Sequence, residues 1–234
     1  MLPELPPNFS VAVDALHALA EKVLSAAYFH STAHIGLRPT PRGFGTPVFG
    51  DAERVRVDAT ELVHERAGEV RRHEITTLDA AAAFVGVPLG APSVFTATTT
   101  IPPDASLAVD RDSSLALGDW YALGAALMHD LRTTHEDVSS SDLQIWPEHF
   151  DLACELGDAD AGTRANYGAS PGDMGIGEPY LYVGPWDASR KTGKLATHGF
   201  GAAITYTELT AAGDAKGAGL DFFLEGAALL LGQP

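Results

Sequence analysis

The chain has 234 residues, of which 45% are hydrophobic, and a formal net charge of −16 at pH 7. A chain of this length and apolar content can bury a substantial core. Binding to nucleic acid or to an anionic membrane surface requires basic side chains gathered on one surface, and the acidic balance argues against both. The sequence therefore predicts neither nucleic acid nor membrane as a partner.

Three further features bear on the compartment in which the protein works. The single cysteine, Cys154, excludes a disulfide bond within the chain. The start of the sequence, M-L-P-E-L-P-P, lacks the basic region and apolar run of a signal peptide. No apolar run in the sequence reaches the length that spans a bilayer. We therefore predict a cytoplasmic protein.

The first half of the chain predicts a long helix, several strands and a short second helix. Ser10 is a suitable N-cap, and apolar residues then recur at helical spacing as far as His30. Ala67-Gly68 marks the turn of a hairpin. The elements expected after the first helix are a strand at 34–38, a Gly/Pro loop at 39–50 anchored by Phe44 and Phe49, a strand at 54–59, hairpin strands at 61–66 and 69–75, and a helix at 77–85.

The second half begins with a Pro-rich connection, and residues 94–100 within it have the composition of a strand. A helix then begins at Asp112 or Ser113. The last expected helix is so apolar that it must be buried or form a subunit contact. The elements expected after the middle helix are strands at 149–156 and 178–183 with a turn at 170–173 between them, a strand at 198–207, and the apolar helix at 218–231.

These elements predict an α+β fold, with mainly antiparallel sheets flanked by N-terminal, middle and C-terminal helices. We expect a single domain over residues 1–234, or two packed halves of similar build, 1–86 and 113–234, joined by the connection 87–112. Acidity is concentrated late in the chain. Residues 1–90 hold 8 basic and 11 acidic side chains, whereas residues 91–234 hold 7 and 20.

Alternation along two of the expected strands gathers polar side chains on one face. In the first strand, the large apolar side chains must point to the core, which turns His149 and Asp151 away from it. In the second strand, the same reasoning turns Tyr180 and Tyr182 outward. If both strands belong to one sheet and another segment covers this face, the side chains line a pocket. The candidate pocket consists of His149, Asp151, Glu178, Tyr180, Tyr182 and His34.

The same region resembles a large bacterial family that is characterised only by a domain of unknown function. The motifs that carry the resemblance are W-P-E-H-F-D-L at 146–152, A-S-P-G-D at 169–173 and E-P-Y-L-Y at 178–182. The segment G-L-R-P-T-P-R-G-F at 36–44 is also similar, so the resemblance covers most of the chain. The chain departs from the family at 34–37, which reads H-I-G-L where the family is rich in Trp and His. The resemblance implies no particular activity.

The sequence contains no compact motif for a metal or a phosphate. It has no G-x-G-x-x-G after a strand, no P-loop, no G-x-S-x-G and no H-E-x-x-H. A dispersed metal site could draw on His149, Asp151 and Glu178 with His34 or His198. We favour the other interpretation, a histidine held by a carboxylate or a carbonyl. We therefore predict no required metal and no cofactor.

Two functions follow from these patterns. The first is a small-molecule-binding protein or enzyme whose pocket lies on the polar strand faces. The alternative is a non-catalytic structural or interaction protein that self-associates, as a homodimer, through an apolar terminal helix. A covered cleft around His149 favours the first, and a flat solvated face with a large apolar subunit contact favours the second. We expect the first.

Overall fold

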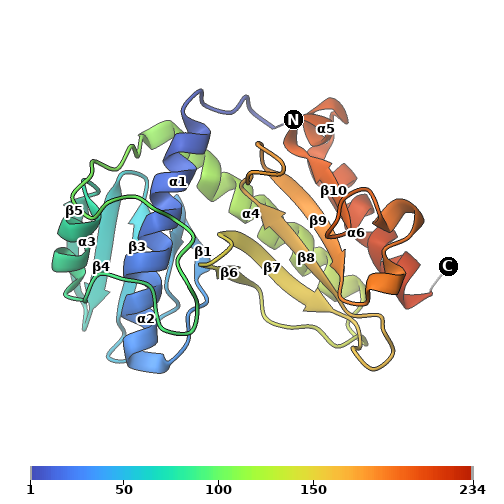
Figure 1. The fold of residues 1–234 in the computed structure, drawn as a ribbon, viewed down its shortest axis with the longest axis horizontal. Coiled ribbons are helices and arrows are strands. Elements are labelled where there is room, and N and C mark those ends of the chain that lie inside the picture. Colours follow the sequence, from blue (N-terminus) through green and yellow to red (C-terminus); the bar gives the residue numbers. More distant parts are fainter. Residues whose placement is uncertain (1, 233–234) are drawn as a thin grey trace. The chain divides into compact units, whose positions relative to one another are not determined.

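A computed structural model describes residues 2–232, and Met1, Gln233 and Pro234 lie outside the described residues. The fold is α+β, with antiparallel sheets and with helices from the start, middle and end of the chain, as predicted (Figure 1). The chain divides into two compact units. The N-terminal unit consists of residues 5–121 and 144–150, and the C-terminal unit consists mainly of residues 122–143 and those from 151 onward.

The predicted N-terminal helix is present as three consecutive segments. They are α1 (Phe9–Leu19), the π-helical turn η1 (Ala20–Leu24) and α2 (Ser25–Thr32). A π-helical turn is a rare geometry that often occurs at functional sites. The helix ends at Ala33, whose left-handed backbone (φ 59°) stops the helical hydrogen bonding.

The N-terminal unit contains a five-stranded antiparallel sheet in the order β1-β2-β3-β4-β5. The β4–β5 hairpin turns at Ala67-Gly68, and α3 (Leu78–Val85) begins after the N-cap Thr77, both as predicted. The strands are β1 (Arg38–Thr40), β2 (Gly43–Gly45), β3 (Arg54–Asp58), β4 (Glu61–Arg66) and β5 (Glu69–Glu74).

Two expectations for this sheet were wrong in detail. The strand expected at 34–38 begins only at Arg38, and the expected loop 39–50 contains the β1–β2 hairpin. Glycine permits the close pairing of β2 with β3, since a Cβ at Gly45 would lie only 2.4 Å from the Cβ of Arg56. The two phenylalanines that were expected to anchor this segment are both buried.

Residues 87–110, named the strap below, contain no helix or strand, so the strand expected at 94–100 was wrong. The backbone N–H groups of Thr98 and Thr99 donate to the carboxylate of Glu21 in η1, at 2.6 and 3.1 Å. The hydroxyl groups of both threonines donate to the same carboxylate. The ammonium group of Lys22 donates to the carbonyl of Thr99 at 2.9 Å. The side chains of Glu21 and Lys22 therefore bind the backbone groups of residues 98 and 99, which were expected to pair with another strand.

The C-terminal unit contains four antiparallel strands in the order β10-β9-β8-β7, followed by two helices. Its elements are β7 (Asp151–Leu156), β8 (Ala165–Ser170), β9 (Tyr180–Pro185), the short turns η2 (Ala188–Arg190) and η3 (Gly193–Leu195), β10 (Ala202–Thr205), α5 (Tyr206–Ala211) and α6 (Ala215–Leu231). The second half of α4 (Arg111–Thr134) also belongs to it, whereas β6 (Gln144–Trp146) lies in the N-terminal unit, where Ile145 bridges Leu37.

Several boundaries in this unit differ from the prediction. The strand expected at 149–156 begins at Asp151, because the backbone of Phe150 is left-handed (φ 56°) and ends a turn. β8 was not predicted. The strand expected at 198–207 is only β10, because the chain enters α5 through a capping box formed by Thr205 and Glu208.

One face of the C-terminal sheet forms the core of its unit. Leu181 and Val183 of β9 are fully buried on this face. Helix α6 approaches β9 closely, since a Cβ at Gly226 would lie 2.9 Å from a methyl group of Val183. Phe223 of α6 is fully buried against the ring of Tyr167, at 5.7 Å between ring centroids. The alternate residues of the same strands lie on the opposite face, which is where polar side chains were predicted.

Candidate ligand-binding site

The strand register places the predicted polar side chains on the face opposite this core. Gly168 of β8 pairs with Tyr182 of β9, and Ser170 pairs with Tyr180. Asp151 begins β7, and alternation along β7 puts it on the same face as these residues. Asp151, Tyr180 and Tyr182 are thus brought together by three neighbouring strands, as the alternation pattern predicts.

The ring of Tyr182 lies flat across Gly168. A Cβ on that glycine would lie 2.3 Å from two ring carbons, so only glycine leaves room for this ring position. From there the Tyr182 hydroxyl donates a hydrogen bond to Oδ2 of Asp151. Burial and the Asp151 carboxylate raise the pKa of Tyr182, which therefore remains a protonated donor at neutral pH.

A second tyrosine and aspartate pair lies beside the first. The Tyr180 hydroxyl donates to Oδ2 of Asp173 at 2.5 Å, and Oδ1 of Asp173 accepts from the backbone N–H groups of Gly175 and Ile176 at 2.6 and 2.9 Å. Burial alone would raise the pKa of Asp173, but these hydrogen bonds lower it. Asp173 is therefore an ionised carboxylate whose donors here are a phenol and two amides.

Phe200 adds an exposed aromatic ring to the two tyrosines. Its ring centroid lies 6.0 Å from that of Tyr180, 5.9 Å from that of Tyr182 and 5.3 Å from that of His198. A tight turn that pairs His198 with Gly201 carries it to this position. The side chain is 38% exposed. We name this set the tyrosine cluster; its members are Asp151, Asp173, Tyr180, Tyr182, His198 and Phe200.

The other predicted pocket residues have different surroundings. The Glu178 carboxylate accepts from the backbone N–H and the hydroxyl of Thr207, at 3.0 and 2.6 Å, and so fixes the start of α5. His149 and His34 belong to the N-terminal unit, and both are exposed. The left-handed Phe150 separates His149 from β7, so the alternation argument does not extend to His149.

Sequence reasoning missed three features of the tyrosine cluster. Phe200 was assigned to the strand expected at 198–207, although a large aromatic residue between Gly199 and Gly201 indicates an exposed turn. Asp173 was assigned only to a turn. Gly168 was missed together with β8, because A-N-Y-G-A-S lacks the β-branched residues typical of a strand.

Among residues 2–232, no group of three or more His, Cys, Asp or Glu side chains is arranged to hold a metal ion. Burial raises the pKa of Cys154 to about 12, so its thiol stays protonated at neutral pH and is not a nucleophile. Within the same residues, no helix is both long and apolar enough to cross a bilayer. The side chains of the tyrosine cluster supply phenols, carboxylates, an imidazole and an apolar aromatic ring.

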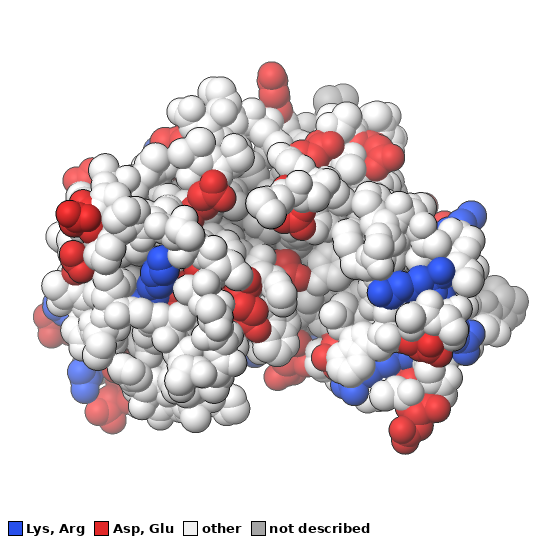
Figure 2. Space-filling view, viewed as in Figure 1, with Lys and Arg blue, Asp and Glu red and all other residues white. Residues whose placement is uncertain are grey.

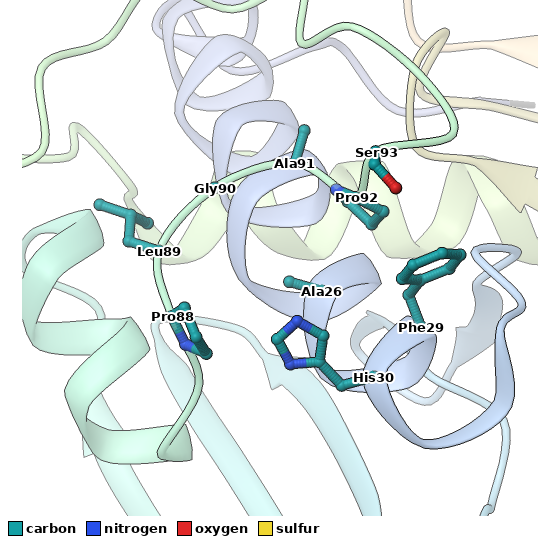
Figure 3. A pocket seen from close by; sticks show the side chains of 9 residues that line it. All are labelled: Ala26, Phe29, His30, Pro88, Leu89, Gly90, Ala91, Pro92 and Ser93. Carbon is teal, nitrogen blue, oxygen red and sulfur yellow. The ribbon is translucent and has the colours of Figure 1, made fainter.

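An open groove of about 250 Å³ lies in the N-terminal unit, between α2 and the strap (Figure 3). Phe29 and His30 line one side, and residues 88–93 of the strap line the other. The N–H of Gly90 donates to the carbonyl of Lys22 at 3.1 Å, which fixes the strap at this point. Most of the lining side chains are apolar, and His30 is the one lining residue with an ionisable side chain.

Acidic side chains are scattered over the face shown in Figure 2, whereas basic side chains form a few separate groups there. This distribution fits the formal net charge of −16.

Comparisons with known proteins identify no relative of this chain. No family model matches the sequence, no curated protein matches it, and no solved structure matches the fold.

Proposed function

We propose that the protein binds a small organic molecule on the polar face of β7–β9, at the tyrosine cluster. The observation that carries the proposal is the Tyr182 ring, which lies across Gly168 and holds the Asp151 carboxylate. A glycine that serves to seat an aromatic ring, and a phenol that serves to orient a carboxylate, form a preorganised polar site on a rigid sheet.

The surroundings of this pair also support binding. Tyr180 and Asp173 repeat the arrangement on the same face, and Phe200 adds an apolar surface that is 38% exposed. Ligand sites typically combine aromatic surface with a few convergent polar groups on a rigid support. The proposed site consists of the tyrosine cluster, within the C-terminal unit, and the proposal includes binding but no reaction.

The alternative proposal is self-association through the final helix. Leu229 of α6, which is 48% exposed, is the observation in its favour. However, Phe223 and Leu230 of the same helix are buried. A single exposed leucine is common on the surfaces of monomeric proteins. The ligand-binding proposal therefore has the stronger support.

A fragment screen by ligand-observed NMR, followed by titration of each hit, tests the proposal. We expect hits whose affinity falls about tenfold or more in Phe200→Ala and in Asp151→Asn, because each substitution removes roughly 1.4 kcal/mol or more of contact. Trp186→Ala and Glu155→Gln are the matched controls, since they remove an exposed ring directly after β9 and a carboxylate of β7. Hits that respond equally to all four substitutions, or to none, would disprove the proposal.

A further inference from the structure

We infer that the tyrosine cluster recognises an organic cation, such as a quaternary ammonium group or an alkylated amine. This inference rests on the proposed function and names the chemical class of its ligand. Three observations support it: the chemistry of the cluster, a related contact on the same sheet face, and the position of Phe200.

The tyrosine cluster combines carboxylates with aromatic rings. The Asp173 carboxylate accepts hydrogen bonds from a phenol and from two backbone amides, all of them neutral donors. Neutral donors stabilise a carboxylate without cancelling its negative charge, and aromatic ring faces attract cations. A ligand with a diffuse positive charge would complement both kinds of group.

The same sheet face already holds a cation of the chain in a similar setting. The guanidinium carbon of Arg164 lies 4.6 Å from the ring centroid of Trp186, and Arg164 pairs with the carboxylate of Glu155. Every second residue of a strand points to the same face. Arg164 lies four residues before Gly168, and Trp186 lies four residues after Tyr182, so both lie on this face. One ring and one carboxylate thus bind a guanidinium group here. The tyrosine cluster offers the same two groups in larger number.

Phe200 is the most exposed ring of the tyrosine cluster, since its side chain is 38% exposed and that of Tyr180 only 5%. Its neighbours in the chain are Gly199 and Gly201, and Gly201 has φ 153°, a conformation that favours glycine. The ammonium group of Lys191 donates to the carbonyl of Gly199 at 3.3 Å and so supports the turn that carries Phe200. A ligand cation that enters beside Phe200 would contact its ring and the two tyrosine rings.

A pair of probes of equal shape and different charge tests the inference. Choline carries a trimethylammonium group, and 3,3-dimethylbutan-1-ol is its uncharged isostere. Titrations of protein with labelled Phe and Tyr are followed by NMR, at constant ionic strength maintained with sodium chloride. We expect choline to shift the resonances of Phe200, Tyr180 and Tyr182, and to bind about tenfold more tightly than the alcohol. Phe200→Ala should weaken choline binding several-fold, whereas Trp186→Ala should leave it unchanged.

The other possible outcomes contradict the cation inference alone or the proposed function as well. If the alcohol binds as tightly as choline at these residues, the site is apolar, so the cation inference is wrong while the proposed function stands. If choline shifts only the resonances of Trp186, it competes with Arg164, and the inference for the tyrosine cluster is again wrong. If neither probe shifts the cluster and the hits of the fragment screen ignore Phe200→Ala, both the inference and the proposed function are wrong.

Discussion

The two sheets of this protein differ in the groups that donate hydrogen bonds to most of their carboxylates. On the face of β3–β5 that carries Arg54, carboxylates face guanidinium groups across the strands. Glu65 pairs with Arg54 at 2.8 Å and with Arg56 at 3.0 Å, and Asp58 pairs with Arg42 at 3.0 Å and with Arg72 at 3.1 Å. On the polar face of β7–β9, Glu155 also pairs with Arg164, but Asp151 and Asp173 accept hydrogen bonds from tyrosine hydroxyls.

This difference separates a structural surface from a candidate site. A network of ion pairs neutralises its own charges, and removing one buried carboxylate leaves its guanidinium groups without that partner. Phenols orient a carboxylate without matching its charge, and their rings add surface for a ligand. The contrast therefore predicts that substitutions in the first sheet change stability, whereas those in the tyrosine cluster change binding more than stability.

The largest expected effect lies beneath the second sheet. Phe223→Ala should lower the free energy of unfolding by roughly 3–5 kcal/mol, because this fully buried ring supports β7–β9 from the core side. Leu229→Ala, at an exposed position of the same helix, is the control and should cost less than about 0.5 kcal/mol. Urea denaturation at two protein concentrations measures both values. A midpoint that rises with concentration would support the dimer alternative instead.

Glycine-to-alanine substitutions compare the two sheets directly. Gly45→Ala places a Cβ 2.5 Å from a backbone oxygen of β3, which cannot move aside, so we expect a loss of roughly 1–3 kcal/mol. Gly168→Ala meets the ring of Tyr182, which can swing away, so the loss of stability should be smaller. Thermal denaturation measures the loss in each variant.

The displaced Tyr182 ring should also release Asp151 and abolish ligand binding in Gly168→Ala. Crystal structures or NMR spectra of both variants would reveal the ring position. An unmoved Tyr182 in Gly168→Ala would contradict the described geometry.

Asp58→Asn and Asp173→Asn compare a carboxylate among arginines with one among neutral donors. Hydrogen bonds to charged groups contribute roughly 1.5–3 kcal/mol, so Asp58→Asn should cost about that much at pH 7. Asp173→Asn keeps an oxygen that can accept from the amides, so it should cost less than about 1 kcal/mol. Chemical denaturation measures both losses. If the two variants lose equal stability, the proposed difference between carboxylates among arginines and those among neutral donors is wrong.

The smallest expected effect is on the loss of stability at acidic pH. Burial would raise the pKa of Glu65, but Arg56 and Arg54 lower it below its ordinary value of 4.5. A group with a lowered pKa stabilises the fold above its unfolded pKa, and this contribution is lost as the pH falls through the folded pKa. Glu65→Gln should therefore reduce the loss of stability between pH 5 and pH 3, relative to Glu69→Gln on the exposed edge strand. Parallel acid-dependence in the two variants would contradict this assignment.

The parts of the fold that the sequence predicted are those in which periodicity dominates. The helix at the start of the chain, the β4–β5 hairpin and the final helix all follow apolar spacing or turn residues. The capping box that begins α5, formed by Thr205 and Glu208, was a recognisable signal that the strand interpretation overrode.

The misses follow from contacts between distant residues. Thr98 and Thr99 have strand-forming composition, but the buried carboxylate of Glu21 takes their N–H groups, and no local pattern encodes that contact. Tyr180 and Tyr182 were placed correctly by alternation. The position of His149 depends instead on the left-handed backbone of Phe150, a conformation that is unusual for an aromatic residue.

The attachment of the strap has a consequence for the order in which the chain folds. The contact between Glu21 and Thr98 closes a loop of 77 residues, and closing a long loop costs chain entropy before the contact offsets it. Helix and hairpin contacts of the N-terminal unit are local and can form earlier. We therefore expect docking of the strap to be a late kinetic step. Substitutions at Glu21 should then accelerate unfolding while leaving the refolding rate nearly unchanged.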